Sequence, residues 1–206
     1  MNRYNKIWMI TGLLIVLLCT GCGQRTAVVK DTFLLSAQRP GASVQSSSET
    51  VLAVQPFSIA PAFQGKGLVY RKDENQYESD YYNEYFISPA SMMTNQTRNW
   101  LSESGAFGQV LSPVSSMAPT HVLEGHIKQI AADVRDEAKQ QAVLELTFFL
   151  IEQNKRDRAI RYQKTYVATR SFEDDTASAC IVALNQCLSE ILGNLEQDLA
   201  SNLSAK

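Results

Sequence analysis

Residues 120–169 carry the clearest alternation of apolar and polar positions in the chain, which predicts β-strands. In the first strand the alternation changes parity between Lys128 and Gln129, and a bulge there would return its apolar residues to one face. Polar turns at 135–139 and 154–157 separate the strands, so the pattern predicts a three-stranded antiparallel meander. The apolar positions are Leu123, Gly125, Ile127, Ile130, Ala132 and Val134, then Leu144, Leu146, Phe148 and Leu150, then Ile160, Tyr162 and Tyr166.

The segment after the meander has the period of an amphipathic helix. Asp174 and Asp175 are suited to cap its start, and its apolar residues form one stripe that should lie across the sheet. The stripe consists of Ala177, Cys180, Ile181, Leu184, Leu188, Ile191, Leu195 and Leu199.

The first half of the chain has shorter signals. Strands are expected at 32–37, 51–54, 68–71 and 107–111, with a loop at 38–49. Ser88 followed by Pro89 is typical of a helix start, and Gly105 of its end. These elements together predict an α+β domain with a mostly antiparallel sheet and a C-terminal meander, packed by a mid-chain helix and a long C-terminal helix.

The N-terminus resembles a bacterial lipoprotein signal. Arg3 and Lys6 precede an apolar stretch of about a dozen residues, too short to span a bilayer. Leu18 to Gly21 then lead to Cys22, as in a lipobox, so residues 1–21 are expected to be a signal peptide and Cys22 the lipidated residue. An ordinary secretory signal, which would release a soluble protein, is the alternative.

The length and net charge of the chain after residue 21 limit the kinds of partner and the number of domains to expect. Removing residues 1–21 takes away two of the 19 basic residues and none of the 21 acidic ones, which leaves a formal charge of −4. This charge does not favour binding to nucleic acid or to an anionic membrane surface. Residues 22–30 would form a lipidated tether, of which Gly23 to Lys30 reaches about 27 Å when extended. Residues 31–206 suit a single domain.

Catalytic and metal-binding patterns do not stand out in the sequence. His121 and His126 are five apart on a predicted strand and would point to opposite faces, which argues against a metal site. The acidic run 173–175 is better explained as a helix cap than as a catalytic cluster. We find no nucleophile elbow, phosphate loop or dinucleotide motif, so we expect neither an enzyme nor a cofactor.

The two cysteines of the predicted domain are expected to be buried thiols. Cys180 and Cys187 are seven residues apart on the predicted long helix, so their Cα atoms would be about 10.5 Å apart. This exceeds the roughly 7 Å limit for a disulfide. Both would lie on one helix face and pack as small apolar side chains.

The segment from Tyr70 to Phe86 holds five of the eight tyrosines, interleaved with acidic residues. Tyrosine provides a large, rigid contact area with a polar end, which suits a recognition surface. The candidate partner-binding residues are Tyr77, Tyr81, Tyr82 and Tyr85. A hairpin or edge strand whose tyrosines straddle core and solvent explains the segment equally well.

The order of these segments resembles the ABC-type transport auxiliary lipoprotein family. The resemblance extends from about Thr32 to Leu203. It rests on the lipobox, on the segments 33–37, 51–57, 67–71 and 107–110, on the helix start at Ser88 and Pro89, and on the closing helix.

The resemblance implies an outer-membrane lipoprotein that faces the periplasm in an intermembrane lipid transport system. Its implied partner is a periplasm-spanning protein with MCE domains, which the lipoprotein would dock at the membrane. A homo-oligomeric ring of the lipoprotein would fit this setting. A module that carries a lipid between sheet and long helix is the alternative, and an anchored regulator of an envelope enzyme is a third reading.

Overall fold

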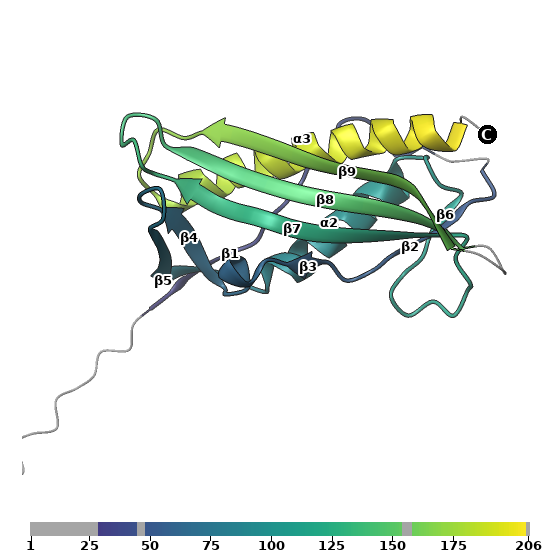
Figure 1. Ribbon diagram of the computed structural model, residues 1–206, viewed down its shortest axis with the longest axis horizontal. Coiled ribbons are helices and arrows are strands. Elements are labelled where there is room, and N and C mark those ends of the chain that lie inside the picture. The colour runs from purple at the N-terminus through teal and green to yellow at the C-terminus, as the bar shows by residue number, and fades with distance from the viewer. Residues whose placement is uncertain (1–28, 45–47, 154–157, 205–206) are drawn as a thin grey trace, which may run out of the picture.

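The computed structural model describes residues 29–44, 48–153 and 158–204. The expected signal peptide, Cys22 and most of the tether lie outside these residues. The described chain forms one mixed sheet, with a long helix across one face and a shorter helix beside it (Figure 1). The buried side chains of the sheet and of both helices belong to one connected core.

The predicted meander is confirmed. It consists of β7 (His121–Asp133), β8 (Gln141–Gln153) and β9 (Arg158–Ser171), each antiparallel to the next. The register of β7 against β8 shifts between Ile127 and Gln129, which is the bulge that the sequence predicts. Leu123, Ile127 and Ile130 are consequently all buried. The turn predicted at 154–157 lies outside the described residues.

A second register shift, between Leu150 and Ile151, was not expected. Leu150 pairs with Tyr162, whereas Ile151 pairs with Ile160. Successive residues of β8 point to opposite faces, so Ile160 lies on the face opposite to Tyr162 and is exposed. The expectation that Ile160 continues the apolar row of Tyr162 and Tyr166 was therefore wrong.

The expectation of a mostly antiparallel sheet was also wrong, because among the described strands five pairs are parallel and three are antiparallel. Three short strands, β2 (Val51–Val54), β3 (Ser58–Ile59) and β4 (Gly67–Arg71), pair in turn with β7, all parallel to it. A short 3₁₀ helix, Pro61–Phe63, lies between β3 and β4. Strands of two to five residues are too short for their own pattern to reveal the direction of their partner.

The remaining strands extend both ends of the sheet. At one end β4 pairs antiparallel with β5 (Tyr77–Tyr85), which pairs parallel with β1 (Asp31–Phe33). At the other end β2 pairs parallel with β6 (Gln109–Val110). The strands predicted at 32–37 and 107–111 are thus confirmed only in part. After Phe33 the chain leaves the sheet and bonds to the helices.

The mid-chain helix α2 spans Pro89–Glu103, as the sequence predicts. The Ser88 hydroxyl accepts a hydrogen bond from the Ser91 amide, and Pro89 occupies the first turn. Gly105 follows the helix with φ +72°, a conformation that glycine adopts without strain. Trp100 is buried near the end of the helix.

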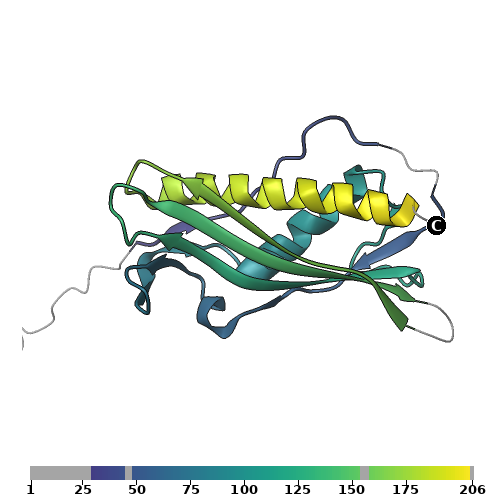
Figure 2. The same cartoon turned by 45° about the horizontal axis from the view of Figure 1, so that its top comes forward.

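The C-terminal helix α3 (Ala177–Ser204) crosses one face of the meander, against β8 and β9 (Figure 2). Its predicted apolar stripe is confirmed, since Cys180, Leu188 and Leu195 are almost fully buried. The predicted cap is wrong: the Thr176 hydroxyl, rather than Asp174 or Asp175, accepts from an amide of the first turn, that of Ala179. None of the helices in the described chain has the apolar length that a membrane crossing requires.

The cysteines lie as the sequence predicts. His126 contacts the Ser58 hydroxyl, and His121 is buried. Cys180 and Cys187 are buried free thiols. Burial raises the pKa of Cys180 to about 12 and that of Cys187 to about 11.

Candidate functional site

A bulge in β5 presents two of the candidate tyrosines. Gly67 of β4 faces Glu84, whereas Val69 faces Ser79, so β5 takes five residue steps where β4 takes two. The extra residues include Tyr81 and Tyr82, whose rings pack edge to face with their centroids 5.3 Å apart. This segment, residues 80–83, is the tyrosine bulge.

Asp80 stabilises the tyrosine bulge through its carboxylate. Oδ1 accepts from the amides of Tyr82 at 2.7 Å and Asn83 at 3.0 Å, and Oδ2 accepts from the Asn83 side chain at 2.9 Å. Burial by itself would raise the pKa of Asp80, but these hydrogen bonds outweigh it and hold the pKa below its usual value. Asp80 therefore favours its ionised form, which accepts the hydrogen bonds that hold the bulge.

The four candidate tyrosines separate into exposed and buried members. Tyr81 and Tyr82 are 61% and 60% exposed, and Tyr77, whose ring meets that of Phe63, is 46% exposed. Tyr85 is only 2% exposed and belongs to the core, where burial raises its pKa. Tyr85 cannot contact a partner at this surface, so its expected role as a binding residue is corrected.

The tyrosine bulge lies where the described chain begins. β1 pairs with the end of β5, with Asp31 opposite Asn83 and Phe33 opposite Tyr85. Lys30 forms an ion pair with Glu84 at 3.0 Å, and its ammonium lies 4.8 Å from the centre of the Tyr81 ring. A polar hollow of about 720 Å³ opens beside the bulge, lined among others by Tyr81, Tyr82, Lys72 and Arg135.

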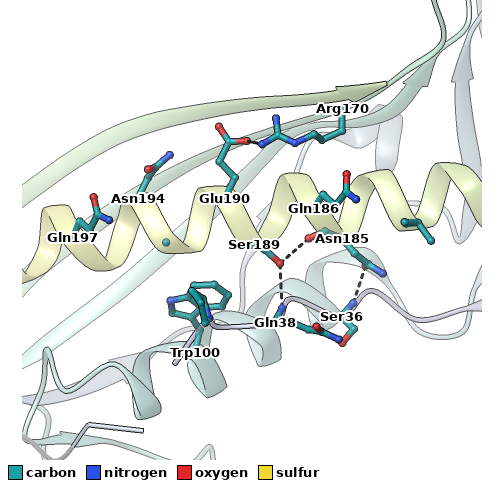
Figure 3. A pocket seen from close by; sticks show the side chains of 13 residues that line it. Ser36, Gln38, Trp100, Arg170, Asn185, Gln186, Ser189, Glu190, Asn194 and Gln197 are labelled. Carbon is teal, nitrogen blue, oxygen red and sulfur yellow. Dashed lines mark hydrogen bonds and ion pairs between the residues drawn. The ribbon is translucent and has the colours of Figure 1, made fainter. Parts of the chain in front are cut away.

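A second hollow, of about 740 Å³, follows the exposed side of α3 (Figure 3). Its other wall is the segment that leaves β1. The amide of Ser36 donates to Asn185 Oδ1 at 2.9 Å, and the amide of Gln38 donates to Ser189 Oγ at 3.1 Å. On the α2 side of this segment, the amide of Ala37 donates to Gln96 Oε1 at 3.1 Å. The segment is thus held across the junction of α2 and α3.

Charged groups that line this hollow, Arg170 and Glu190, and two that lie next to its lining residues, Arg39 and Glu196, are paired within the chain. Glu196 accepts two hydrogen bonds from Arg39, at 3.0 and 2.8 Å, and one from the indole of Trp100 at 2.7 Å. The bond to Glu196 raises the pKa of Arg39. Arg170 pairs with Glu190 at 2.5 Å. The hollow is left with uncharged polar side chains around Val182 and Gly193.

The space between sheet and α3 is filled by core side chains. Leu144, Leu146 and Phe148 of β8 and Leu188 and Leu195 of α3 each have no accessible surface and share one core. A lipid carried between these two layers, which the sequence leaves open as an alternative, would have to displace this packing.

A polar cluster fixes the end of α3 to β9. Asp198 Oδ2 accepts from Lys164 at 2.6 Å, from Tyr166 at 2.6 Å and from Tyr162 at 2.8 Å. The bond from Lys164, followed by that from Tyr166, lowers the pKa of Asp198. Burial raises the pKa of Tyr162 to about 12 and also raises that of Tyr166. All these groups are satisfied by one another, which is typical of a structural clamp.

Sequence reasoning missed both the tyrosine bulge and the hollow on α3. The sequence does hold one signal for the bulge. An Asp side chain often accepts hydrogen bonds from backbone amides two or three residues later, and Tyr82 and Asn83 stand at these positions after Asp80. The hollow has no comparable signal, since Ser36 and Asn185 are 149 positions apart.

A comparison with models of protein families identifies one family for the chain. The model of the family described as "ABC-type transport auxiliary lipoprotein component" matches residues 33–195. No curated protein sequence matches the chain significantly.

Solved structures share the fold at low sequence identity. A Xanthomonas campestris protein matched by the DUF330 family model has a TM-score of 0.72 at 14% identity, over 84% of this chain and 97% of that one. An uncharacterized protein has a TM-score of 0.65 at 14% identity, over 83% of this chain and 99% of that one. A hypothetical protein from Chlamydia trachomatis has a TM-score of 0.50 at 10% identity, over 75% of this chain and 99% of that one. At these identities the likeness establishes the fold alone.

Proposed function

The chain belongs to the family of ABC-type transport auxiliary lipoprotein components, and from this premise we propose that it docks a periplasm-spanning partner at the outer membrane. Within the family the sequence resembles the intermembrane transport lipoprotein PqiC. The partner proposed on this resemblance is a protein with MCE domains, and the cargo a lipid or another apolar molecule.

One observation carries the docking proposal: Tyr81 of the tyrosine bulge lies next to Lys30, which is eight positions after Cys22. Lys30 contacts both Tyr81 and Glu84. If Cys22 carries the acyl chains, the extended tether of about 27 Å keeps the tyrosine bulge near the leaflet. Acyl chains on one cysteine, at about 0.8 kcal/mol per buried methylene, would make the attachment stable. A partner that ends at the membrane would meet this surface.

Tyr77, Tyr81 and Tyr82 are the proposed partner-contact residues. Exposed tyrosines are enriched in protein interfaces because they bury a large area at a small cost in side-chain entropy. Two acidic residues next to Tyr81 and Tyr82 are satisfied within the chain, since Asp80 bonds to the bulge and Glu84 to Lys30. The surface therefore presents rings rather than unpaired carboxylates at the bulge.

The alternative function, carriage of a lipid by the domain itself, has less support. The layers that would enclose the lipid are packed against each other without accessible side chains at their centre. Native mass spectrometry of the gently extracted protein separates the two functions. A lipid mass beyond the acyl chains on Cys22 would favour carriage, and its absence favours docking.

Affinity purification of the lipidated chain from native envelopes tests the docking proposal. The MCE-domain protein recovered with it is quantified by mass spectrometry, with Tyr77, Tyr81 and Tyr82 changed together to Ala. We expect severalfold lower recovery than with Val167→Ala, which alters a residue on β9 that is also 60% exposed. Unchanged recovery with the triple variant would remove the tyrosines from the interface. Sedimentation of the same complex reports whether several copies form a ring.

A further inference from the structure

The edge of the sheet formed by β1 and β5 carries a second group of exposed apolar side chains, separate from the tyrosine bulge. Phe33, the last residue of β1, pairs with Tyr85, and the amide of Phe86 donates to the Phe33 carbonyl at 2.8 Å, so Leu34 and Phe86 both follow directly after this pair. Leu34 is 57% exposed and Phe86 59%, and Ile87 follows at 36%. We call Leu34, Phe86 and Ile87 the edge patch.

Large apolar side chains this exposed at one place call for a contact that covers them. β1 is the last strand at its end of the sheet, so no further strand covers this edge in the described chain. We propose that the edge patch rests on the headgroup region of the lipid leaflet to which the chain is anchored. This inference rests on the proposed function, because it requires the acyl anchor at Cys22.

The edge patch lies close in the chain to the proposed anchor at Cys22, which favours the lipid leaflet as the surface that covers it. Leu34 is four residues from Lys30, a distance of about 13 Å along an extended strand. Lys30 is only eight positions after Cys22, so the anchor point lies within about 27 Å of Lys30. Figure 1 shows β1 and β5 at one end of the long axis and β6 at the other. The edge patch is therefore on the end that the anchor holds near lipid.

The charges around the patch fit a zwitterionic surface. Lys66 donates to the Phe86 carbonyl at 2.8 Å, and Lys30 is paired with Glu84. With exposed Asp31, two basic and two acidic groups border the patch and cancel. Aromatic and aliphatic side chains flanked by lysines are the composition found where proteins meet the interface of a membrane. A leaflet rich in phosphatidylethanolamine would impose little repulsion on this edge.

Fluorescent labels at single introduced cysteines test the proposal in the full lipidated protein. Leu34→Cys and Phe86→Cys are each labelled with nitrobenzoxadiazole, and Val114→Cys, 93% exposed in the segment after β6, is the control. The native thiols, Cys180 and Cys187, are buried and should stay unlabelled. The proteins are reconstituted in zwitterionic vesicles of phosphatidylethanolamine and phosphatidylcholine, with or without brominated acyl chains.

We expect brominated lipid to quench the labels at Leu34 and Phe86 severalfold more than the label at Val114, with a blue shift only at the first two positions. Equal responses at all three positions, in protein that floats with the vesicles, would overturn the inference and leave the anchor intact. Protein that does not float with the vesicles, and carries no acyl group at Cys22, would contradict the proposed anchor and the inference together.

Discussion

Arg39 and Glu196 form a two-point ion pair that fastens the segment after β1 to α3, with distances of 3.0 and 2.8 Å. Two parallel bonds between guanidinium and carboxylate fix geometry better than a single contact. The same carboxylate accepts the indole N–H of buried Trp100 on α2. Glu196 therefore joins three parts of the chain that are distant in sequence.

Changing Glu196 to Gln should lower the free energy of unfolding by about 2 kcal/mol, because a charged acceptor of three bonds becomes a neutral one. Urea denaturation followed by Trp fluorescence measures the change. Glu173→Gln, at an exposed position before α3, is the control and should have little effect. Equal stability of the two variants would show that the junction does not depend on this carboxylate.

The clamp at Asp198 predicts a dependence of stability on pH. Its pKa is lowered in the folded chain, so its contribution is present above the unfolded value of about 3.9 and is lost as the pH falls through the folded value. Asp198→Asn should cost about 1 kcal/mol at neutral pH, a modest value because Lys164 is half exposed. The difference between native and variant protein should shrink below about pH 4. A difference that stays constant down to acid unfolding would contradict this assignment.

The tyrosine bulge depends on the absence of a side chain at Gly67. A Cβ there would lie 2.5 Å from the Asp80 carbonyl oxygen and close to the Ser79 hydroxyl. Gly67→Ala should destabilise the fold by about 2 kcal/mol and weaken recovery of the partner, because the backbone of the bulge must move. Gly65→Ala, where a Cβ would meet nothing within 4 Å, is the matched control. Hydrogen exchange at residues 80–83 reports the displacement, and protection equal to that of the control would argue against it.

The two buried thiols should be inert in the native protein. Burial raises the pKa of both, so the reactive thiolate is scarce near neutral pH. An aromatic disulfide reagent at about pH 8 should react with Cys180 and Cys187 only after denaturant is added. Rapid reaction of either thiol without denaturant would show that α3 separates readily from the sheet.

The sequence predicts the long elements well because their periodicity extends over many residues. The bulge after Ile127 could be predicted because the apolar positions of the strand change from odd to even numbers there. The start of α2 could be predicted from Ser88 followed by Pro89. The directions of β2, β3 and β4 were not readable, because each is set by its place along β7. Short strands contain no information about a partner that lies some 60 or more positions away in the chain.

The candidate site illustrates the same limit. Tyr81 and Tyr85 are four positions apart, so a regular strand would point both side chains to the same face. Only Tyr85 pairs with β1 and is buried in the core, whereas Tyr81 is exposed. Which tyrosines are exposed is decided by the bulge and by the position of β1. Sequence alone could therefore select the segment, but it could not separate its exposed members from the buried one.

Metabolic labelling with a fatty-acid probe tests the central claim, that this body is fastened to a membrane through Cys22. Native protein and Cys22→Ala are compared for incorporated label and for membrane fractionation, with Cys180→Ala as a control that removes a buried thiol. We predict label and outer-membrane recovery for the native and control proteins and the loss of both for Cys22→Ala. Labelling and membrane recovery that survive in Cys22→Ala would contradict the account.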